Sequence, residues 1–461
     1  MVCSNKPDIH FSELTNNPVY DSIKSKGSPL KLSFTNYGDA YLRAFEKKCK
    51  SVTFIVTHQC SLRCTYCYEN HKEDKHMSLD IGKRCVDFLF EEDLKNSKFI
   101  NSEDCNGILI DFIGGEPLLE VKLIDSIMDY FLHKAIQLNH RWKTQFAISM
   151  STNGVDLMKP DCLNFIQKWK NKLSINVTID GNKELHDKCR LFPNGDPSYD
   201  IAIKSALYCR EIFGDSPTKI TLSPDNISYT FEAVKDIIQT LHPSYLHGNP
   251  CFEKGWEIEH STIYYNELKK IADWSIQNRI YENCYITFFD TFLGTPLPDT
   301  ETKNWCGGTG DMLAFDIDGN IYPCLRYSPV SIPKHLSEPM IIGDIYNGFL
   351  KKECQRKCIT CLESITRQSQ STQECLECPI ASGCSWCSAY NYEVFGTPNK
   401  RATFICDLHK ARCLANNYYW NMLAKSLNIK ERLPLNVPQN MALPIISESE
   451  YQMLYELSGD K

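Results

Sequence analysis

The sequence predicts an α/β fold with a parallel sheet, followed by a cysteine-rich second half. Over residues 51–241, short apolar runs alternate with patterns of helical spacing. This is typical of repeated strand–helix units joined by right-handed crossovers. The pattern leaves open whether the sheet is open or closed into a barrel. Of the 23 cysteines, eleven lie between Cys306 and Cys413, so the halves differ in composition.

Length and composition narrow the class of protein. A chain of 461 residues with 42% hydrophobic content can bury a large core and form two or three domains. The 50 basic and 57 acidic residues are interspersed, so we expect no nucleic-acid partner. With no signal peptide and no apolar stretch long enough to span a bilayer, we expect a cytoplasmic location and no membrane. In that reducing compartment, clustered cysteines indicate metal rather than disulfides.

Each predicted strand is a short apolar run that a helical pattern follows. The strands are expected at 52–56, 108–113, 146–150, 173–179 and 219–222. Ser78 is placed to cap the first helix, and the later helices are expected at 117–133, 162–169, 199–213 and 227–241. In such folds, ligands bind at the carboxyl ends of the strands. Motifs that follow the strands are therefore expected to meet at one edge of the sheet.

Cys60, Cys64 and Cys67 follow the first predicted strand with the spacing C-x3-C-x2-C. Three thiolates in one tight loop can hold three irons of a 4Fe–4S cluster and leave the fourth iron without a protein ligand. Zinc usually takes four ligands in two separated pairs, which fits this motif poorly. The loop therefore predicts a cluster with one open iron.

This spacing resembles that of radical S-adenosylmethionine (SAM) enzymes, in which the open iron binds SAM and cleaves it to a 5′-deoxyadenosyl radical. Residues 51–245 resemble their partial (β/α)6 TIM-like barrel. The resemblance implies Tyr66 beside the adenine, and Gly114, Gly115, Glu116 and Pro117 at the SAM amino group. It also implies Ser151 and Asn153 on the ribose side, and Thr178, Asp180 and Arg190 around the SAM carboxylate. Serine is the familiar residue at the position of Thr178.

Each of these motifs also has an ordinary structural explanation. Gly-Gly-Glu-Pro can be a tight turn, Asn153-Gly154 is a common turn signal, and Arg190 can be a solvated surface residue. Their order along the chain favours the cofactor site.

The second half resembles the SPASM extension, which holds two auxiliary 4Fe–4S clusters in radical SAM enzymes that modify peptides. The resemblance implies one cluster on Cys375, Cys378, Cys384 and Cys406, and another on Cys306, Cys324 and Cys387. The last pair, Cys384 and Cys387, is separated by two residues where the family usually has three. A hairpin with Gly319 in its turn is expected between Cys306 and Cys324. The second cluster has either an open iron or a distant fourth thiol, with Cys251, Cys284 and Cys413 as candidates.

Other cysteines have simpler explanations. Cys354, Cys358 and Cys361 repeat the first spacing but follow no predicted strand, so buried or surface thiols are favoured over a further cluster. The lone cysteines are expected to be small apolar residues of the core or of helices; they are Cys3, Cys49, Cys85, Cys105, Cys162 and Cys209. A zinc ribbon remains an alternative for the second half.

The overall resemblance is to radical SAM peptide maturases with a SPASM domain, and more distantly to anaerobic sulfatase-maturating enzymes. The latter have an aspartate base after the cysteine that corresponds to Cys324, where this chain has Leu325, which argues against formylglycine formation. Segments 221–227 and 397–403 resemble maturases of cysteine-repeat peptides, so thioether formation on a ribosomal precursor peptide is the leading hypothesis. C–C crosslinking, peptide epimerization and an inactive metal-binding scaffold are the alternatives. The resemblance implies an electron donor such as ferredoxin or flavodoxin.

The expected organisation has five parts. They are an N-terminal extension (1–50), the partial barrel (51–245), a bridging region (246–304), the SPASM domain (305–413) and a C-terminal helix and tail (414–461). A packed helix is expected within the bridging region, near 261–280.

Overall fold

The computed structural model describes residues 17–25, 49–69, 72–95, 97, 99–216, 218–253, 255–302, 307–309, 312–332, 338–349 and 351–459. Of the residues singled out above, Cys3 and the predicted cluster ligand Cys306 lie outside the described residues.

The main sheet has eight strands in the order β13-β12-β11-β10-β1-β3-β4-β5. The pairs β10–β1, β1–β3, β3–β4 and β4–β5 are parallel, and the remaining pairs are antiparallel. Its strands are β1 (Cys49–Thr57), β3 (Gly107–Gly114), β4 (Phe146–Thr152), β5 (Leu173–Val177), β10 (Met312–Phe315), β11 (Asn320–Tyr322), β12 (Gly343–Asp344) and β13 (Gly348–Phe349). The predicted α/β fold with a parallel sheet is confirmed.

A smaller parallel sheet, β7-β8-β9, continues the series of strands beyond β5. Its strands are β7 (Thr218–Leu222), β8 (Tyr245–Pro250) and β9 (Tyr285–Ile286). The Thr218 hydroxyl donates a 2.9 Å hydrogen bond to the Val177 carbonyl, which links the two sheets. Strands β8 and β9 were not predicted from the sequence, because Tyr-Leu-His-Gly-Asn-Pro is poor in β-branched residues and β9 is only two residues long.

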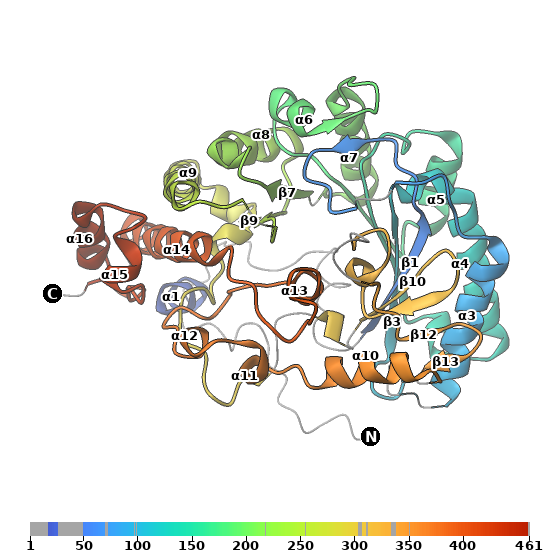
Figure 1. The fold of residues 1–461 in the computed structure, drawn as a ribbon. Helices are drawn as coiled ribbons and strands as arrows, with labels where there is room; N and C mark the ends of the chain where they lie inside the picture. Colours follow the sequence, from blue (N-terminus) through green and yellow to red (C-terminus); the bar gives the residue numbers. More distant parts are fainter. Residues whose placement is uncertain are drawn as a thin grey trace.

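Helices follow the strands and form an arc around them (Figure 1). They are α3 (Leu79–Leu94), α4 (Val121–Gln137), α5 (Pro160–Trp169), α6 (Lys183–Cys189), α7 (Tyr199–Phe213), α8 (Thr230–Leu241) and α9 (Ile258–Gln277). Ser78 caps α3 as expected, since its hydroxyl accepts a 3.2 Å hydrogen bond from the Ile81 amide. The helix expected from residue 117 begins with the short 3-10 helix η2 (Pro117–Glu120), and η4 (Ile227–Tyr229) likewise precedes α8.

The cysteine-rich half supplies short helices on the other side of the strands (Figure 1). They are α10 (Glu353–Glu363), α11 (Arg367–Gln370), α12 (Gln373–Leu376) and α13 (Ser388–Phe395). The long helix α14 (Cys406–Ser426) then packs along α9 and contacts α1 (Pro18–Ser25), α15 (Gln439–Ala442) and α16 (Glu448–Leu457). Helix α14 begins at Cys406 rather than after Cys413, so Cys413 lies within it.

The two halves share one sheet and one core. Strand β10, from the cysteine-rich half, pairs in parallel with β1. Phe54 of β1 packs on Phe112 of β3 and on Phe315 of β10, with ring centroids 5.5 and 5.3 Å apart. Phe88 of α3 contacts Phe315 from the helix side at 5.9 Å. Separating the halves would expose these buried rings, so they are held together by the hydrophobic effect.

The hairpin expected around Gly319 is present between β10 and β11. One carboxylate oxygen of Asp316 accepts hydrogen bonds from the amides of Asp318 and Asn320, at 2.9 and 2.8 Å. Gly319 has a φ of +82°, which favours glycine.

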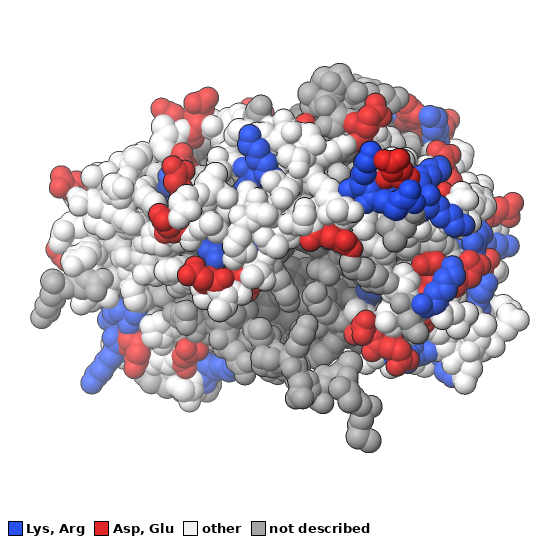
Figure 2. Space-filling view, turned by 60° about the horizontal axis from the view of Figure 1, so that its bottom comes forward, with Lys and Arg blue, Asp and Glu red and all other residues white. Residues whose placement is uncertain are grey.

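The distribution of charged and apolar residues in the structure agrees with two expectations from the sequence, interspersed charges and no membrane-spanning segment in the described residues. Basic and acidic side chains are intermixed on the face shown in Figure 2. In the described part of the chain, each helix is too short or too polar to cross a membrane.

The Gly319 turn gives a direct test of this architecture. A Cβ at residue 319 would lie 2.8 Å from Cγ1 of Ile345, in addition to the strain of the positive φ. We expect Gly319→Ala to lower the free energy of unfolding by about 3 kcal/mol. The matched control is Gly195→Ala, where φ is +87° but nothing lies within 4 Å of the Cβ position, with an expected loss of about 1 kcal/mol. Urea unfolding measures both, and equal losses would contradict the packing of Gly319 against Ile345.

Candidate active site

The cysteine loop leaves β1 at the carboxyl edge of the parallel sheet. Within it, β2 (Arg63–Cys64) pairs in antiparallel fashion with β6 (Arg190–Leu191), and Cys64 lies opposite Arg190 in register. The Thr65 amide also donates a 3.0 Å hydrogen bond to the Cys189 carbonyl. The structure therefore brings together the cysteine motif and Arg190, which are more than a hundred residues apart in sequence.

The Gly-Gly-Glu-Pro segment, which follows β3, lies against the start of the cysteine loop. The amides of Gly115 and Glu116 donate hydrogen bonds of 3.0 and 2.8 Å to the carbonyls of Thr57 and Gln59. A Cβ at Gly115 would overlap the Gln59 carbonyl and lie 3.0 Å from the Cβ of Cys60. The glycines are thus required by the close approach of the two backbones.

Glu116 is fully buried and joins three loops. Its carboxylate accepts hydrogen bonds from the Thr152 hydroxyl (2.6 Å) and from the amides of Asn153 (2.8 Å) and Leu118 (3.1 Å). Burial raises the pKa of Glu116 to about 7. Asn153, positioned in this way, directs its side-chain amide to the Ser61 hydroxyl at 3.0 Å and to the Cys60 sulfur at 3.8 Å.

Tyr66, Asp180 and Arg190 form a buried polar cluster beside Cys64. The Tyr66 hydroxyl donates a hydrogen bond to Asp180 and accepts one of 2.7 Å from Arg190, which also forms a 3.6 Å ion pair with Asp180. Two atoms of the cluster are buried without a partner, Nε of Arg190 and Oδ1 of Asp180. Because unpaired buried polar groups are costly, a donor and an acceptor here suit a polar ligand.

The remaining predicted SAM residues lie on the same side of the site or support it. The Thr178 amide donates a 3.0 Å hydrogen bond to the Thr152 carbonyl, and Ser151 is exposed at the carboxyl end of β4. Pro117 is buried at the start of η2, where its fixed φ suits the first turn of a helix.

Two cations, Lys72 and Arg190, lie near the three thiols. Lys72 places its ammonium 3.4 Å from the Cys67 sulfur and 3.7 Å from the Glu69 carboxylate. Burial raises the pKa of Cys60 to about 11, while Lys72 acts in the opposite direction. Burial also raises the pKa of Cys64, and there Arg190 opposes the rise. A coordinated metal would deprotonate these thiols outright, so a cationic setting with three thiols fits a cluster.

The four cysteines of the first predicted auxiliary cluster lie near one another. Burial raises the pKa of Cys384 to about 11, Arg401 lowers it, and the neighbouring thiols Cys406, Cys378 and Cys375 raise it. Arg401 donates a 2.6 Å hydrogen bond to the Cys384 sulfur and stacks on Trp386 at 4.0 Å. The fold therefore assembles this group from α12, the loop after it and the start of α14.

The second predicted group is described only in part, since Cys306 lies outside the described residues. Cys387 is an electrostatic neighbour of the Arg326 guanidinium, and Cys324 of the Tyr68 hydroxyl. Arg326 pairs with Glu253 at 2.7 Å and with Glu393 at 3.8 Å. The same guanidinium lies 4.9 Å from the Tyr68 ring, which follows Cys67.

The candidate fourth thiols differ in position. Cys251 shares Arg326 as an electrostatic neighbour with Cys387. Cys413 lies instead near Cys384, Cys378 and Cys406, and Cys284 is buried.

Cys354, Cys358 and Cys361 lie on α10, where positions i, i+4 and i+7 share one face. Contrary to the expectation from sequence, a short strand, β13, precedes them. Cys85, Cys162 and Cys209 are buried, as predicted for apolar positions, whereas Cys105 is half-buried in a loop, contrary to the prediction. Among the residues that the structure describes, no three Cys, His, Asp or Glu side chains are arranged to hold a single metal ion.

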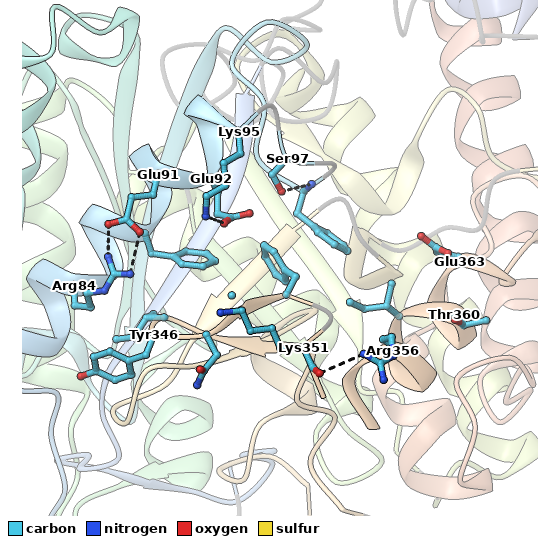
Figure 3. Close-up of a pocket in the computed structure, with 17 residues that line it drawn as sticks. Arg84, Glu91, Glu92, Lys95, Ser97, Tyr346, Lys351, Arg356, Thr360 and Glu363 are labelled. Atoms are coloured by element: carbon cyan, nitrogen blue, oxygen red, sulfur yellow. Dashed lines mark hydrogen bonds and ion pairs between the residues drawn. The ribbon is translucent and has the colours of Figure 1, made fainter. Parts of the chain in front are cut away.

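A cavity of about 550 Å³ lies elsewhere (Figure 3). It is bounded by α3, the β12–β13 turn and α10, with Phe88, Phe99 and Phe349 in its wall. The ion pairs Arg84–Glu91 and Lys95–Glu92 lie at its edge. None of the predicted site residues lines it, so it is distinct from the cysteine loop.

Three residues at the site were not predicted from the sequence: Lys72, Tyr68 and Arg326. No motif marks Lys72, although its place five residues after Cys67 was a weak signal. Tyr68 and Arg326 each lie next to a motif, but only the fold shows that they meet.

Comparison with known proteins agrees with the motifs. A family model described as a 4Fe-4S single cluster domain matches residues 49–190. An uncharacterized protein of Methanocaldococcus jannaschii is 30% identical over 41% of this chain and 58% of its own length. The radical SAM cyclopropyl synthase TigE of Paramaledivibacter caminithermalis is 21% identical over 78% of this chain and 72% of its own. The subtilosin biosynthesis protein AlbA of Bacillus subtilis is 21% identical over 73% and 66%, so the chain spans less than two thirds of two of these relatives.

Solved structures show the same fold. An anSMEcpe structure with bound AdoMet and a peptide matches with a TM-score of 0.57 and 17% identity, covering 83% of this chain and all of that one. Streptococcus suis SuiB bound to the precursor peptide SuiA matches with a TM-score of 0.51 and 14% identity, covering 76% and 74%. The chain is similar to proteins named as radical SAM and sulfatase-maturating enzymes, and the resemblance inferred from its motifs is confirmed.

The buried Glu116 predicts a pH dependence. Its pKa of about 7 lies above the value of about 4.3 for an unfolded chain, so the folded protein binds more protons between those values. This contribution to stability is complete below about pH 4 and is lost as pH rises through 7. We expect the Tm of Glu116→Gln to fall less between pH 5 and pH 7.5 than that of the wild type.

The exposed Glu374→Gln is the control and should leave the pH dependence unchanged. Identical Tm profiles for Glu116→Gln and the wild type would contradict the raised pKa of Glu116.

Proposed function

We propose that this chain is a radical SAM maturase that modifies a ribosomally made, cysteine-rich peptide. The single observation that carries the proposal is the meeting of the three-cysteine loop with Gly115 and Arg190 at one edge of the sheet. In this proposal β1, β3, β4, β5, β7 and β8 are the six strands of a partial barrel, and residues 305–413 form the SPASM domain. The relatives named as synthase, biosynthesis protein and maturating enzymes support an enzyme acting on a peptide.

The residues around the cysteine loop have complementary parts in this proposal. Cys60, Cys64 and Cys67 would hold three irons, and Lys72 and Arg190 would balance the charge of the thiolates. When bound, the cluster would supply the electron that cleaves SAM to a 5′-deoxyadenosyl radical, which removes a hydrogen atom from the peptide. Nε of Arg190 would take the SAM carboxylate, with Thr178 beside it, and Tyr66 would lie by the adenine. Gly114, Gly115 and Glu116 would face the amino group, and Ser151 and Asn153 the hydroxyls of the ribose. Asp180 would lie beside the carboxylate, where it pairs with Arg190.

The cysteine-rich half would hold two auxiliary clusters, which gives three 4Fe–4S clusters in all. Cys375, Cys378, Cys384 and Cys406 would form one site, and Cys306, Cys324 and Cys387 the other. The thiols must stay reduced to serve as ligands, which suits the cytoplasm. A ferredoxin or flavodoxin would supply the electron.

Thioether formation is the reaction that we favour. Leu325 follows Cys324, and a leucine cannot act as a general base. The two carboxylates nearest to Arg326, those of Glu253 and Glu393, form ion pairs with it. They are therefore engaged and do not replace the missing general base. A second candidate is peptide epimerization, for which the half-buried Cys251 would donate the hydrogen atom.

The reaction is tested with reconstituted, reduced protein, SAM and the cysteine-rich peptide encoded beside its gene. We expect 5′-deoxyadenosine and a peptide that has lost two hydrogens, measured by mass spectrometry. Cys64→Ala should abolish both products because the cluster loses a ligand, whereas Cys354→Ala, on the exposed face of α10, should retain them.

Other outcomes distinguish the alternatives. A product of unchanged mass in ordinary water that gains one unit in heavy water would identify an epimerase and rule out the thioether. Fragmentation that maps the new bond to two carbon atoms would establish C–C crosslinking. No 5′-deoxyadenosine from the wild type would refute the proposed function.

A further inference from the structure

The inner face of the smaller sheet, turned away from the helices, is polar. In β7, Ile220 and Leu222 are buried on the helix side, whereas Lys219 and Thr221 are half-buried on the opposite side. In β8, the half-buried His247 and Asn249 pair in register with Lys219 and Thr221. A cation and several hydrogen-bonding groups therefore line this face at the end of the series of parallel strands.

Lys219 differs from the other cations around the site. Arg190 pairs with Asp180, Arg326 with Glu253, Lys72 with Glu69 and Arg412 with Asp290. Lys219 has neither a hydrogen-bond acceptor nor a carboxylate at ion-pair distance among the described residues. Burial lowers the pKa of Lys219, and Cys251 and Asp180 oppose this shift without forming an ion pair with it. Charges in a protein interior are normally paired with an opposite charge. The ammonium of Lys219 has no carboxylate in that position among the described residues, which leaves room for an anionic ligand.

Two amide oxygens on the strands around Lys219 also lack hydrogen-bond partners, although Nδ2 of Asn249 donates a 3.2 Å hydrogen bond to the Pro250 carbonyl. Oδ1 of Asn249 is buried without a hydrogen bond on the same face of β8. Oδ1 of Asn176 is likewise unpaired, on a residue that is 9% exposed. Asn176 belongs to β5, next to β7, since the adjacent residues Val177 and Thr218 are hydrogen bonded. Three unpaired polar groups from neighbouring strands thus face the same side.

We propose that Lys219, Asn176 and Asn249 form a subsite for a carboxylate of the substrate peptide and the N–H groups next to it. Lys219 supplies the positive charge, and the amide oxygens accept hydrogen bonds from the peptide backbone. The favoured source of the carboxylate is an Asp or Glu side chain. This assignment rests on the proposed function, because that function makes the ligand a peptide.

The subsite is tested on reconstituted protein with SAM by equilibrium selection from pools of synthetic cysteine-containing peptides. The first pool contains Asp and Glu at random positions and has amidated C-termini. The second has Asn and Gln in their place, and the third equals the second but has free C-terminal carboxylates. Bound peptides are quantified by mass spectrometry. We expect about tenfold preference for the first pool over the second, which corresponds to about 1.4 kcal/mol.

Variants assign the preference to Lys219. Lys219→Met should abolish it and Lys219→Arg should retain it. Lys204→Met, on the exposed side of α7, is the matched control and should bind as the wild type does. Preference for the third pool would support the carboxylate subsite with the C-terminus as its source. A wild type without any preference for carboxylates, or a Lys219→Met protein that keeps it, would overturn the proposal.

Two further readouts separate this proposal from the proposed function. 5′-Deoxyadenosine formation without a preference for acidic peptides would disprove the subsite alone. The preference without 5′-deoxyadenosine would disprove the radical reaction and leave the subsite. If Lys219→Met weakens SAM binding in the absence of peptide, Lys219 serves SAM, and the subsite is wrong.

Discussion

Two backbone hydrogen bonds hold the candidate site together, from the amides of Gly115 and Glu116 to the carbonyls of Thr57 and Gln59. They fix the end of β3 against the start of the cysteine loop, at a distance that leaves no room for a Cβ at Gly115. From there the carboxylate of Glu116 positions Asn153 at the end of β4. The antiparallel pairing of Cys64 with Arg190 fixes the other side of the loop. The proposed SAM contacts of Gly115, Glu116 and Asn153 depend on these hydrogen bonds.

The same framework connects the first half of the chain to the second. Strand β10 extends the main sheet beside β1, and Phe315 enters the core next to Phe54. Arg326 then lies between Tyr68, next to the first cysteine motif, and Cys387 of the second half. Tyr68 from the first half and Arg326 from the second therefore contribute to one half-buried polar region, which suits a substrate held between the proposed clusters.

Local signals in the sequence predicted most of the fold. Ser78, a residue type that often caps helices, predicted the start of α3, and the apolar run that contains Phe112 predicted β3. Strand β8 was missed because its glycine and proline weaken the strand signal, and only pairing with β7 reveals it. The motifs predicted that Cys64 and Arg190 belong to the site. They did not predict that the two residues lie opposite each other in the β2–β6 ladder. The role of Lys219 could not be predicted from the sequence, because the lack of a partner depends on the residues that surround it in the folded protein.

The central claim is that the cysteines of both halves bind iron–sulfur clusters. Iron and acid-labile sulfide per chain, measured after anaerobic reconstitution, test it most directly. Three 4Fe–4S clusters require about twelve irons and as many sulfides. About four irons, with zinc bound in the second half, would contradict the account.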